Sequence, residues 1–144
     1  MTNLSKLLPA FFLILITLVN ISCKEEVIGT VVSESEIIGT WQLTKIIASY
    51  PSGVKELTPA EENISFTITL NDDKTYQRNQ DYNGDIINES GNWSLSNGKL
   101  TLNSTSGFVT FPIKMNDNAL QVATSLPDPD SGLLTPVTLE FTKQ

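Results

Sequence analysis

The sequence contains no histidine, one cysteine and one arginine. Without histidine, and with a single cysteine, neither the usual nucleophile–base pairs nor the usual zinc ligand sets can be assembled. Paired carboxylates could still act as they do in a glycosidase, but most acidic residues here lie in turn-like segments, where a solvated charge is the ordinary role. We therefore predict that the protein is not an enzyme and has no catalytic residues, no metal site and no cofactor.

Basic residues are also few. The 144 residues include 9 Lys and Arg against 16 Asp and Glu, which gives a net charge of −7. Binding to nucleic acid, or to anionic lipid headgroups, depends on Lys and Arg side chains that neutralise phosphates. We expect no nucleic-acid partner, and we interpret the excess of acidic residues as a solubility feature of an exposed protein.

The first 22 residues differ in character from the rest. Lys6 is followed by a mostly apolar run over residues 7–21. A membrane-spanning helix needs about 20 apolar residues to cross the bilayer, and this run has roughly 15, which is the length typical of a signal peptide. The sequence favours a cleaved secretory signal over residues 1–22.

Cys23 follows the apolar run directly and is preceded by the small residue Ser22. A free thiol is the simple alternative, but a lone cysteine at this position of an exported chain calls for a specific explanation. Residues 19–23 (VNISC) resemble a bacterial lipobox, although Asn20 replaces the usual apolar residue. The resemblance implies that Cys23 becomes an acylated mature N-terminus. Several acyl chains, at about 0.8 kcal/mol per buried CH₂, anchor a protein to a membrane effectively permanently.

The residues after the cysteine carry a weaker signal. Lys24, Glu25 and Glu26 resemble the surface-export tag of some Gram-negative lipoproteins, and the alternative is an ordinary charged tether. We expect the protein at the outer membrane, on the cell surface or else on the periplasmic face. Residues 23–36 are interpreted as an acidic tether that precedes one domain over residues 37–144.

From residue 37 onward, apolar and polar residues alternate, and turn residues recur every eight to twelve positions. Ser96-Asn97-Gly98-Lys99 is the strongest hairpin signal, since Asn-Gly suits a type I′ turn. We predict a helical turn at 58–61 and no strand in the proline-rich segment 126–136. The predicted strands are 40–50, 64–70, 75–79, 91–95, 100–102, 108–115, 120–124 and 137–141. Eight consecutive antiparallel strands favour an all-β, up-and-down barrel, whose interior is either filled or open to one small ligand.

Several short motifs within this domain resemble lipocalins. Gly39-Thr40-Trp41 is similar to their Gly-x-Trp opening, and Asp73-Lys74-Thr75-Tyr76 and Gly91-Asn92-Trp93 resemble the lipocalin-like domains of bacterial lipoproteins. Ser35-Glu36 is placed to cap the short helical turn that such proteins carry before the first strand. Lipocalins pack an arginine from a late strand over that tryptophan, and here the one arginine is Arg78, so Trp41 is expected to be capped differently.

Two groups of residues are candidate ligand sites. Tyr76 and Arg78 share one face of a predicted strand, and an inward arginine would need an acidic partner or an anionic ligand. The sequence favours a solvated Arg78 at a strand end. Residues 81–85 (DYNGD) match the start of an EF-hand loop, but Ile86 replaces its glycine and Asn92 its final glutamate, which favours an ordinary turn.

The sequence leaves two functions open. In the first, the barrel binds a small apolar or amphipathic ligand, and Tyr76 and Arg78 are the candidate contacts. In the second, the protein is a structural or accessory lipoprotein with a filled barrel that binds a protein or glycan through its loops. The first function requires a mostly apolar pocket of about 300 Å³ or more, and a packed interior would contradict it.

Overall fold

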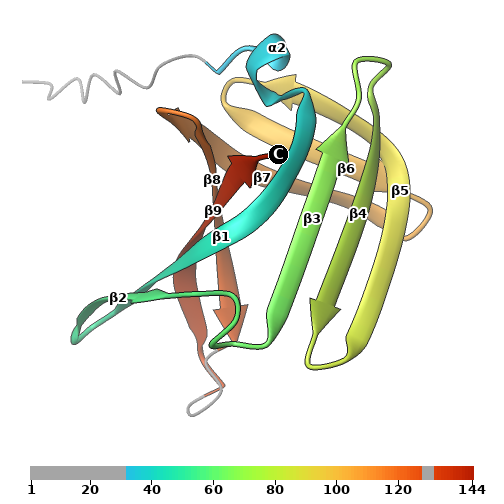
Figure 1. Cartoon of the computed structure of the whole chain (residues 1–144). Helices are drawn as coiled ribbons and strands as arrows, with labels where there is room; N and C mark the ends of the chain where they lie inside the picture. Colours follow the sequence, from blue (N-terminus) through green and yellow to red (C-terminus); the bar gives the residue numbers. More distant parts are fainter. Residues whose placement is uncertain (1–31, 128–131) are drawn as a thin grey trace, which may run out of the picture.

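The computed structural model describes residues 32–127 and 132–144. The expected signal peptide, the expected acylation site at Cys23 and the expected tag at residues 24–26 lie outside the described residues. No helix within the two described ranges is long and apolar enough to span a membrane. The elements shown in Figure 1 are α2 (Glu34–Ile37), β1 (Gly39–Tyr50), β2 (Gly53–Leu57), β3 (Ile64–Leu70), β4 (Thr75–Tyr82), β5 (Asp85–Ser96), β6 (Lys99–Ser104), β7 (Gly107–Asn116), β8 (Ala119–Pro127) and β9 (Leu134–Lys143).

The strands form a closed antiparallel barrel. From β3 to β9 each strand pairs with the next, and β1 pairs with both β3 and β9, so that the sheet closes on itself. The predicted eight-stranded up-and-down barrel is therefore confirmed. β2 is a ninth strand that the sequence did not predict, and among the described strands it pairs with β1 alone. Four of its five residues are exposed, so it lacks the alternation that reveals a strand.

The core follows from the period of two along each strand, which places every second side chain inside the barrel. In β3, Ile68 and Leu70 are buried and Phe66 packs against the core, while Ser65 has an exposed side chain. The buried core cluster comes from residues 32–141, and its members are Val32, Ile37, Trp41, Leu43, Ile46, Ile68, Leu70, Tyr76, Trp93, Leu100, Leu102, Ile113, Leu120, Val122 and Phe141. The barrel thus supplies its own core.

A short helix covers one end of the barrel. Ser33 is the N-cap residue of α2. Glu36 Oε2 accepts hydrogen bonds from Ser33 N at 2.7 Å and from Ser33 Oγ at 2.6 Å. This is a capping box, and the capping residue is Ser33 instead of the expected Ser35. Ile37 and Val32 are buried in the core. Residues 32–36, which were expected to belong to the tether, are therefore part of the folded domain.

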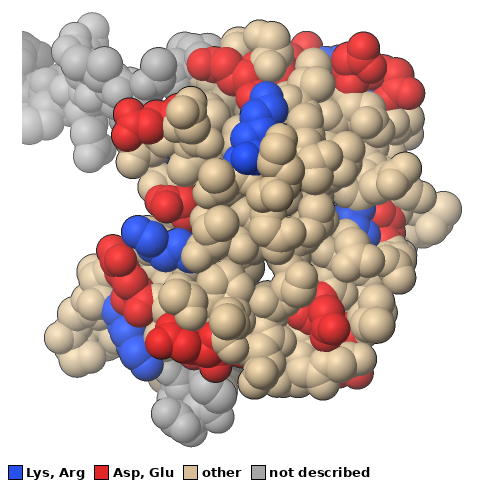
Figure 2. Space-filling view, in the orientation of Figure 1, with Lys and Arg blue, Asp and Glu red and all other residues tan. Residues whose placement is uncertain are grey.

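The barrel wall is weakest at two places, which we call the two seams. β1 pairs with β3 at only four positions (Gly39–Gln42), and β7 pairs with β8 at only four (Ile113–Asn116). Both seams lie toward the α2 end, and beyond them the strands diverge. Figure 1 shows the resulting two groups of strands at the other end of the barrel, with β1, β2, β8 and β9 on one side and β3, β4 and β5 on the other. Figure 2 shows the surface hollowed between them.

The turns agree with the sequence in most places. Asn97 and Gly98 both have positive φ (50° and 68°), as the predicted type I′ hairpin requires. At the predicted helical turn, Thr58 and Glu61 bond each other, with Thr58 N to Glu61 Oε2 at 2.8 Å, but residues 59–63 form consecutive turns instead of a helix.

The prediction that residues 126–136 contain no strand is wrong at both ends. β8 continues to Pro127 and β9 begins at Leu134, so that Pro127 pairs with Leu134 and Pro136 with Ser125. Both prolines lie beyond the stretches where β8 pairs with β7 and β9 pairs with β1. One edge of each strand is unpaired there, and a proline without an N–H is tolerated at such a position.

Candidate functional site

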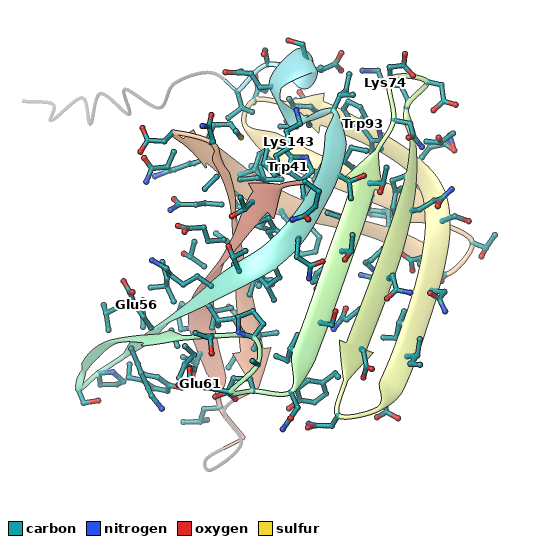
Figure 3. All side chains as sticks on the ribbon, in the orientation of Figure 1. Trp41, Glu56, Glu61, Lys74, Trp93 and Lys143 are labelled. Atoms are coloured by element: carbon teal, nitrogen blue, oxygen red, sulfur yellow. The ribbon has the colours of Figure 1, made fainter. Side chains whose placement is uncertain are left out.

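The end of the barrel under α2 is shut by two tryptophans, each with a lysine over its ring (Figure 3). Trp41 is 1% exposed, and its indole Nε1 donates a 2.7 Å hydrogen bond to the Ile37 carbonyl. Lys143 Nζ lies 5.3 Å from the centroid of the Trp41 ring and donates to the Glu36 carbonyl at 3.4 Å. A lysine from the last strand therefore lies over the Trp41 ring, in the position that an arginine occupies in lipocalins.

Trp93 is held in the same way. Its Nε1 donates to the Asn71 carbonyl at 2.8 Å, and Lys74 Nζ lies 4.2 Å from its ring centroid. The same Lys74 forms a 2.5 Å ion pair with Glu34 of α2. The two Trp–Lys pairs thus attach the helix to the rim of the barrel and leave the opposite end, which we call the open end, as the accessible route to the interior.

Tyr76 and Arg78 both face the interior, as their shared position on β4 predicted. The favoured prediction of a solvated Arg78 at a strand end is wrong, because the Arg78 side chain is only 18% exposed. β4 continues to Tyr82 instead of ending at residue 79, so that Arg78 is in the middle of the strand and pairs with Ile68. The structure therefore realises the alternative in which an inward arginine has an acidic partner.

That partner is Glu89, which sits opposite Arg78 on β5. Its carboxylate accepts a 2.5 Å hydrogen bond from the Tyr76 hydroxyl and lies 3.5 Å from Arg78 Nη2, and Ser106 Oγ donates to it at 3.4 Å. The hydrogen bond from Tyr76, together with the charge of Arg78, lowers the pKa of the Glu89 carboxyl. Burial and the bond to Glu89 raise the pKa of Tyr76. We call Tyr76, Arg78 and Glu89 the polar triad.

Arg78 of the polar triad borders a small, partly open cavity of about 50 Å³. Among the described residues Arg78 is its one polar lining residue, and the others are Phe66, Ile68, Leu100, Leu102, Phe111, Leu120, Val122, Leu139 and Phe141. Pockets for whole small molecules usually measure about 300 Å³ or more. The interior is therefore mostly filled, and it does not meet the criterion set above for an enclosed ligand pocket.

Several apolar side chains remain accessible at the open end. Tyr82, Ile87, Val109 and Leu126 share the inward positions of their strands, yet they remain 38–48% exposed. Exposed apolar side chains gathered around an opening are typical of interaction sites. The open end, with the cavity beneath it, is the candidate functional site.

Two further hollows are shallow and lie outside the barrel. One of about 540 Å³ runs over the loop at residues 60–65 and the β4–β5 turn, and one of about 500 Å³ lies over the polar outer face of β3, β4 and β5. At the β4–β5 turn, Asp81 Oδ1 accepts a 2.8 Å hydrogen bond from Gly84 N. Within the described residues no acidic group is arranged to hold a metal ion. The Asp81–Gly84 hydrogen bond and the turn at residues 83–84 agree with the ordinary turn that the sequence favoured.

Replacing Glu89 with glutamine is expected to reduce stability at pH 7 by about 1 to 3 kcal/mol, because Arg78 loses its charged partner. A carboxyl whose pKa is lowered by folding stabilises the protein above its unfolded pKa, near 4.5, and loses that contribution as the pH falls through the folded pKa. The difference between wild type and E89Q should therefore shrink below about pH 4.5. Urea unfolding at pH 7 and pH 3.5 measures it, and an equal difference at both pH values would contradict it.

A family model described as a lipocalin-like domain matches residues 37–122. Among solved structures, a deswapped triple mutant of the bovine odorant-binding protein is 19% identical, with 76% of this chain and 74% of that chain covered and a TM-score of 0.42. No curated protein matches the chain. Because the family model covers more than half of its residues, the chain belongs to the family of lipocalin-like domains.

Proposed function

We propose that this protein is a lipid-anchored lipoprotein whose lipocalin-like domain binds a small, mostly apolar ligand at the open end of the barrel. The observation that carries the proposal is that four inward-facing apolar side chains, Tyr82, Ile87, Val109 and Leu126, stay partly exposed there. A lipocalin-like barrel is a fold for binding small hydrophobic molecules, and the opposite end is shut by α2 and the two Trp–Lys pairs.

The size of the interior determines the form of binding. A cavity of about 50 Å³ accepts only a small group. The ligand therefore lies at the open end, in the opening where the strands diverge beyond the two seams, which we call the mouth. Only one end of the ligand enters the barrel. Such a ligand stays partly exposed to solvent, which suits a protein that takes up and releases its ligand more than one that stores it.

The anchor and the location rest on the sequence. Cys23 follows a signal-like apolar run within a segment that resembles a lipobox, and Lys24, Glu25 and Glu26 resemble a surface-export tag. Acyl chains on Cys23 would hold the barrel at the outer membrane, and we propose the cell surface as its place. Binding, and not catalysis, is the proposed activity, since the sequence contains no histidine and its one cysteine would be acylated.

The test uses a soluble form, residues 24–144, because the barrel closes on itself and supplies its own core. The uncharged dye N-phenyl-1-naphthylamine should bind to it with enhanced fluorescence. Replacing Ile87 with aspartate should weaken binding about tenfold or more, because a charge at an apolar contact must be desolvated. Ile86→Asp is the matched control, since Ile86 is 64% exposed on the outer side of the same strand.

Each result has a definite meaning. Weakening by I87D alone would support a site in the mouth, and equal weakening by both variants would contradict it. If the wild-type domain bound neither the dye nor any small molecule in native mass spectrometry after purification from its host, the proposal would be wrong. Recovery of protein partners by crosslinking on cells would then favour the accessory function.

A further inference from the structure

Arg78 has a donor that the structure leaves unused. Its Nε atom is buried and has no hydrogen-bond partner among the described residues. The guanidinium borders the 50 Å³ cavity, whose other lining side chains are all apolar. A buried donor without an acceptor is unfavourable by about 1 to 3 kcal/mol, so this position is suited to an acceptor supplied from outside the described residues.

The charge of Arg78 is already compensated. Nη2 faces the Glu89 carboxylate at 3.5 Å, and the carboxylate is further held by the Tyr76 hydroxyl. An anionic ligand at Nε would bring a second negative charge close to Glu89, whose side chain is only 18% exposed, and like charges repel more strongly where water screens them less. The site therefore favours an uncharged acceptor over a carboxylate or phosphate.

Water does not suit the site well. A buried water usually makes about three hydrogen bonds, and an isolated water needs at least two polar partners. Within the described residues the cavity offers Arg78 alone. A ligand oxygen attached to an apolar body makes the one available hydrogen bond and leaves its carbon atoms against the apolar lining.

The position of Arg78 connects this cavity to the mouth. Tyr76 and Trp93 lie on the packed side of it, toward α2. On the other side, two residues along β4 and β5, Gln80 pairs with Ile87 of the open end. Phe66 of β3 pairs with Gln80 and lines the cavity. An apolar chain can therefore run from the mouth past Phe66 to Arg78.

We infer that the open end binds an apolar molecule with one uncharged oxygen acceptor, an alcohol or carbonyl group, and that Arg78 Nε donates to this oxygen while Glu89 excludes anions. The inference rests on the proposed binding function and names its ligand class. Arg78 binds the ligand directly, Glu89 orients Arg78 and compensates its charge, and Tyr76 holds Glu89 in place.

The test compares four eight-carbon probes, 1-octanol, 2-octanone, octane and octanoate, by displacement of N-phenyl-1-naphthylamine from residues 24–144 at pH 7.5. The alcohol and the ketone should bind about tenfold more tightly than octane, the value of one hydrogen bond. Octanoate should bind at least tenfold more weakly than octanol, and E89Q should reduce that gap.

The variant that isolates Arg78 is Arg78→Met combined with Glu89→Gln, which removes both charges together and leaves no buried ion unpaired. In it, octanol and octane should bind equally well. Gln77→Met, on the outer face of β4, is the control and should keep the tenfold preference. Circular dichroism and cooperative urea unfolding confirm that each variant is folded.

The outcomes separate the two proposals. Equal binding of all four probes by the wild type would overturn the role of Arg78 and leave the binding function standing. Tightest binding of octanoate would overturn the uncharged class and show an anion site instead. Dye binding without displacement by any probe would overturn the ligand class, and no dye binding at all would overturn both proposals.

Discussion

Replacing Trp41 with alanine is expected to lower the unfolding free energy by about 3 to 5 kcal/mol. Small domains are stable by only about 5 to 15 kcal/mol, so this single change should leave the domain marginal. Trp41 is among the largest fully buried side chains, and its ring lies between Ile37 of α2 and the lysine from the last strand. Its loss would leave a cavity at the point where α2 and the end of β9 meet.

Two milder variants separate the parts of this effect. Trp41→Phe keeps a ring but removes the indole N–H that binds the Ile37 carbonyl, and it should lose about 1 to 3 kcal/mol beyond the change in ring size. Lys143→Met keeps the aliphatic stem over the ring and removes the charge, and it should lose about 0.5 to 1 kcal/mol. Urea unfolding gives all three values. A loss below about 1 kcal/mol for Trp41→Ala would show that the shut end does not depend on this residue.

Replacing Cys23 with alanine is expected to move the protein from the membrane fraction to the soluble fraction, or to leave it unprocessed with its apolar segment attached. The physical reason is the number of acyl chains: several chains give nearly permanent anchoring, whereas a single chain gives only marginal, reversible binding. Fractionation of cells, with intact-mass measurement of the mature chain, gives the result. The mass should show acylation on the wild-type cysteine and none on the variant.

The matched control for this experiment is Ser22→Ala, which keeps a small residue before the cysteine and should leave processing and anchoring unchanged. A Cys23→Ala protein that is processed and anchored as before would refute the lipobox assignment. Protease treatment of intact cells extends the experiment to location. Wild-type protein on the cell surface should be cleaved, and protein on the periplasmic face should be protected.

The features predicted from the sequence are those that leave a local pattern. The alternation in Ile64–Leu70 and the Asn97-Gly98 turn each fix one strand or hairpin without knowledge of the rest. The shared face of Tyr76 and Arg78 followed from the same period of two. These local patterns were sufficient to give the number of barrel strands and their order.

The features that were missed depend on contacts distant in the sequence. The predicted strand 91–95 begins two residues after Glu89. Only pairing with β4 extends β5 far enough to include Glu89. No local pattern indicates Lys143 as the partner of Trp41, because the resemblance to lipocalins implies an arginine and the two residues are about a hundred positions apart. The filling of the interior depends on how ten side chains from six strands fit together, and no local pattern contains that information.

The pairing of β1 with β9 has a consequence for when the protein can fold. Trp41 pairs with Lys143, so the first barrel strand reaches its final partner only when nearly the whole chain is available. Barrels dominated by such distant pairings fold slowly, in milliseconds to seconds. A partly synthesised chain cannot complete the barrel, and it therefore remains unfolded enough to be translocated across a membrane. For a protein proposed to cross a membrane before it folds, the late closure of the barrel allows translocation to be completed before folding.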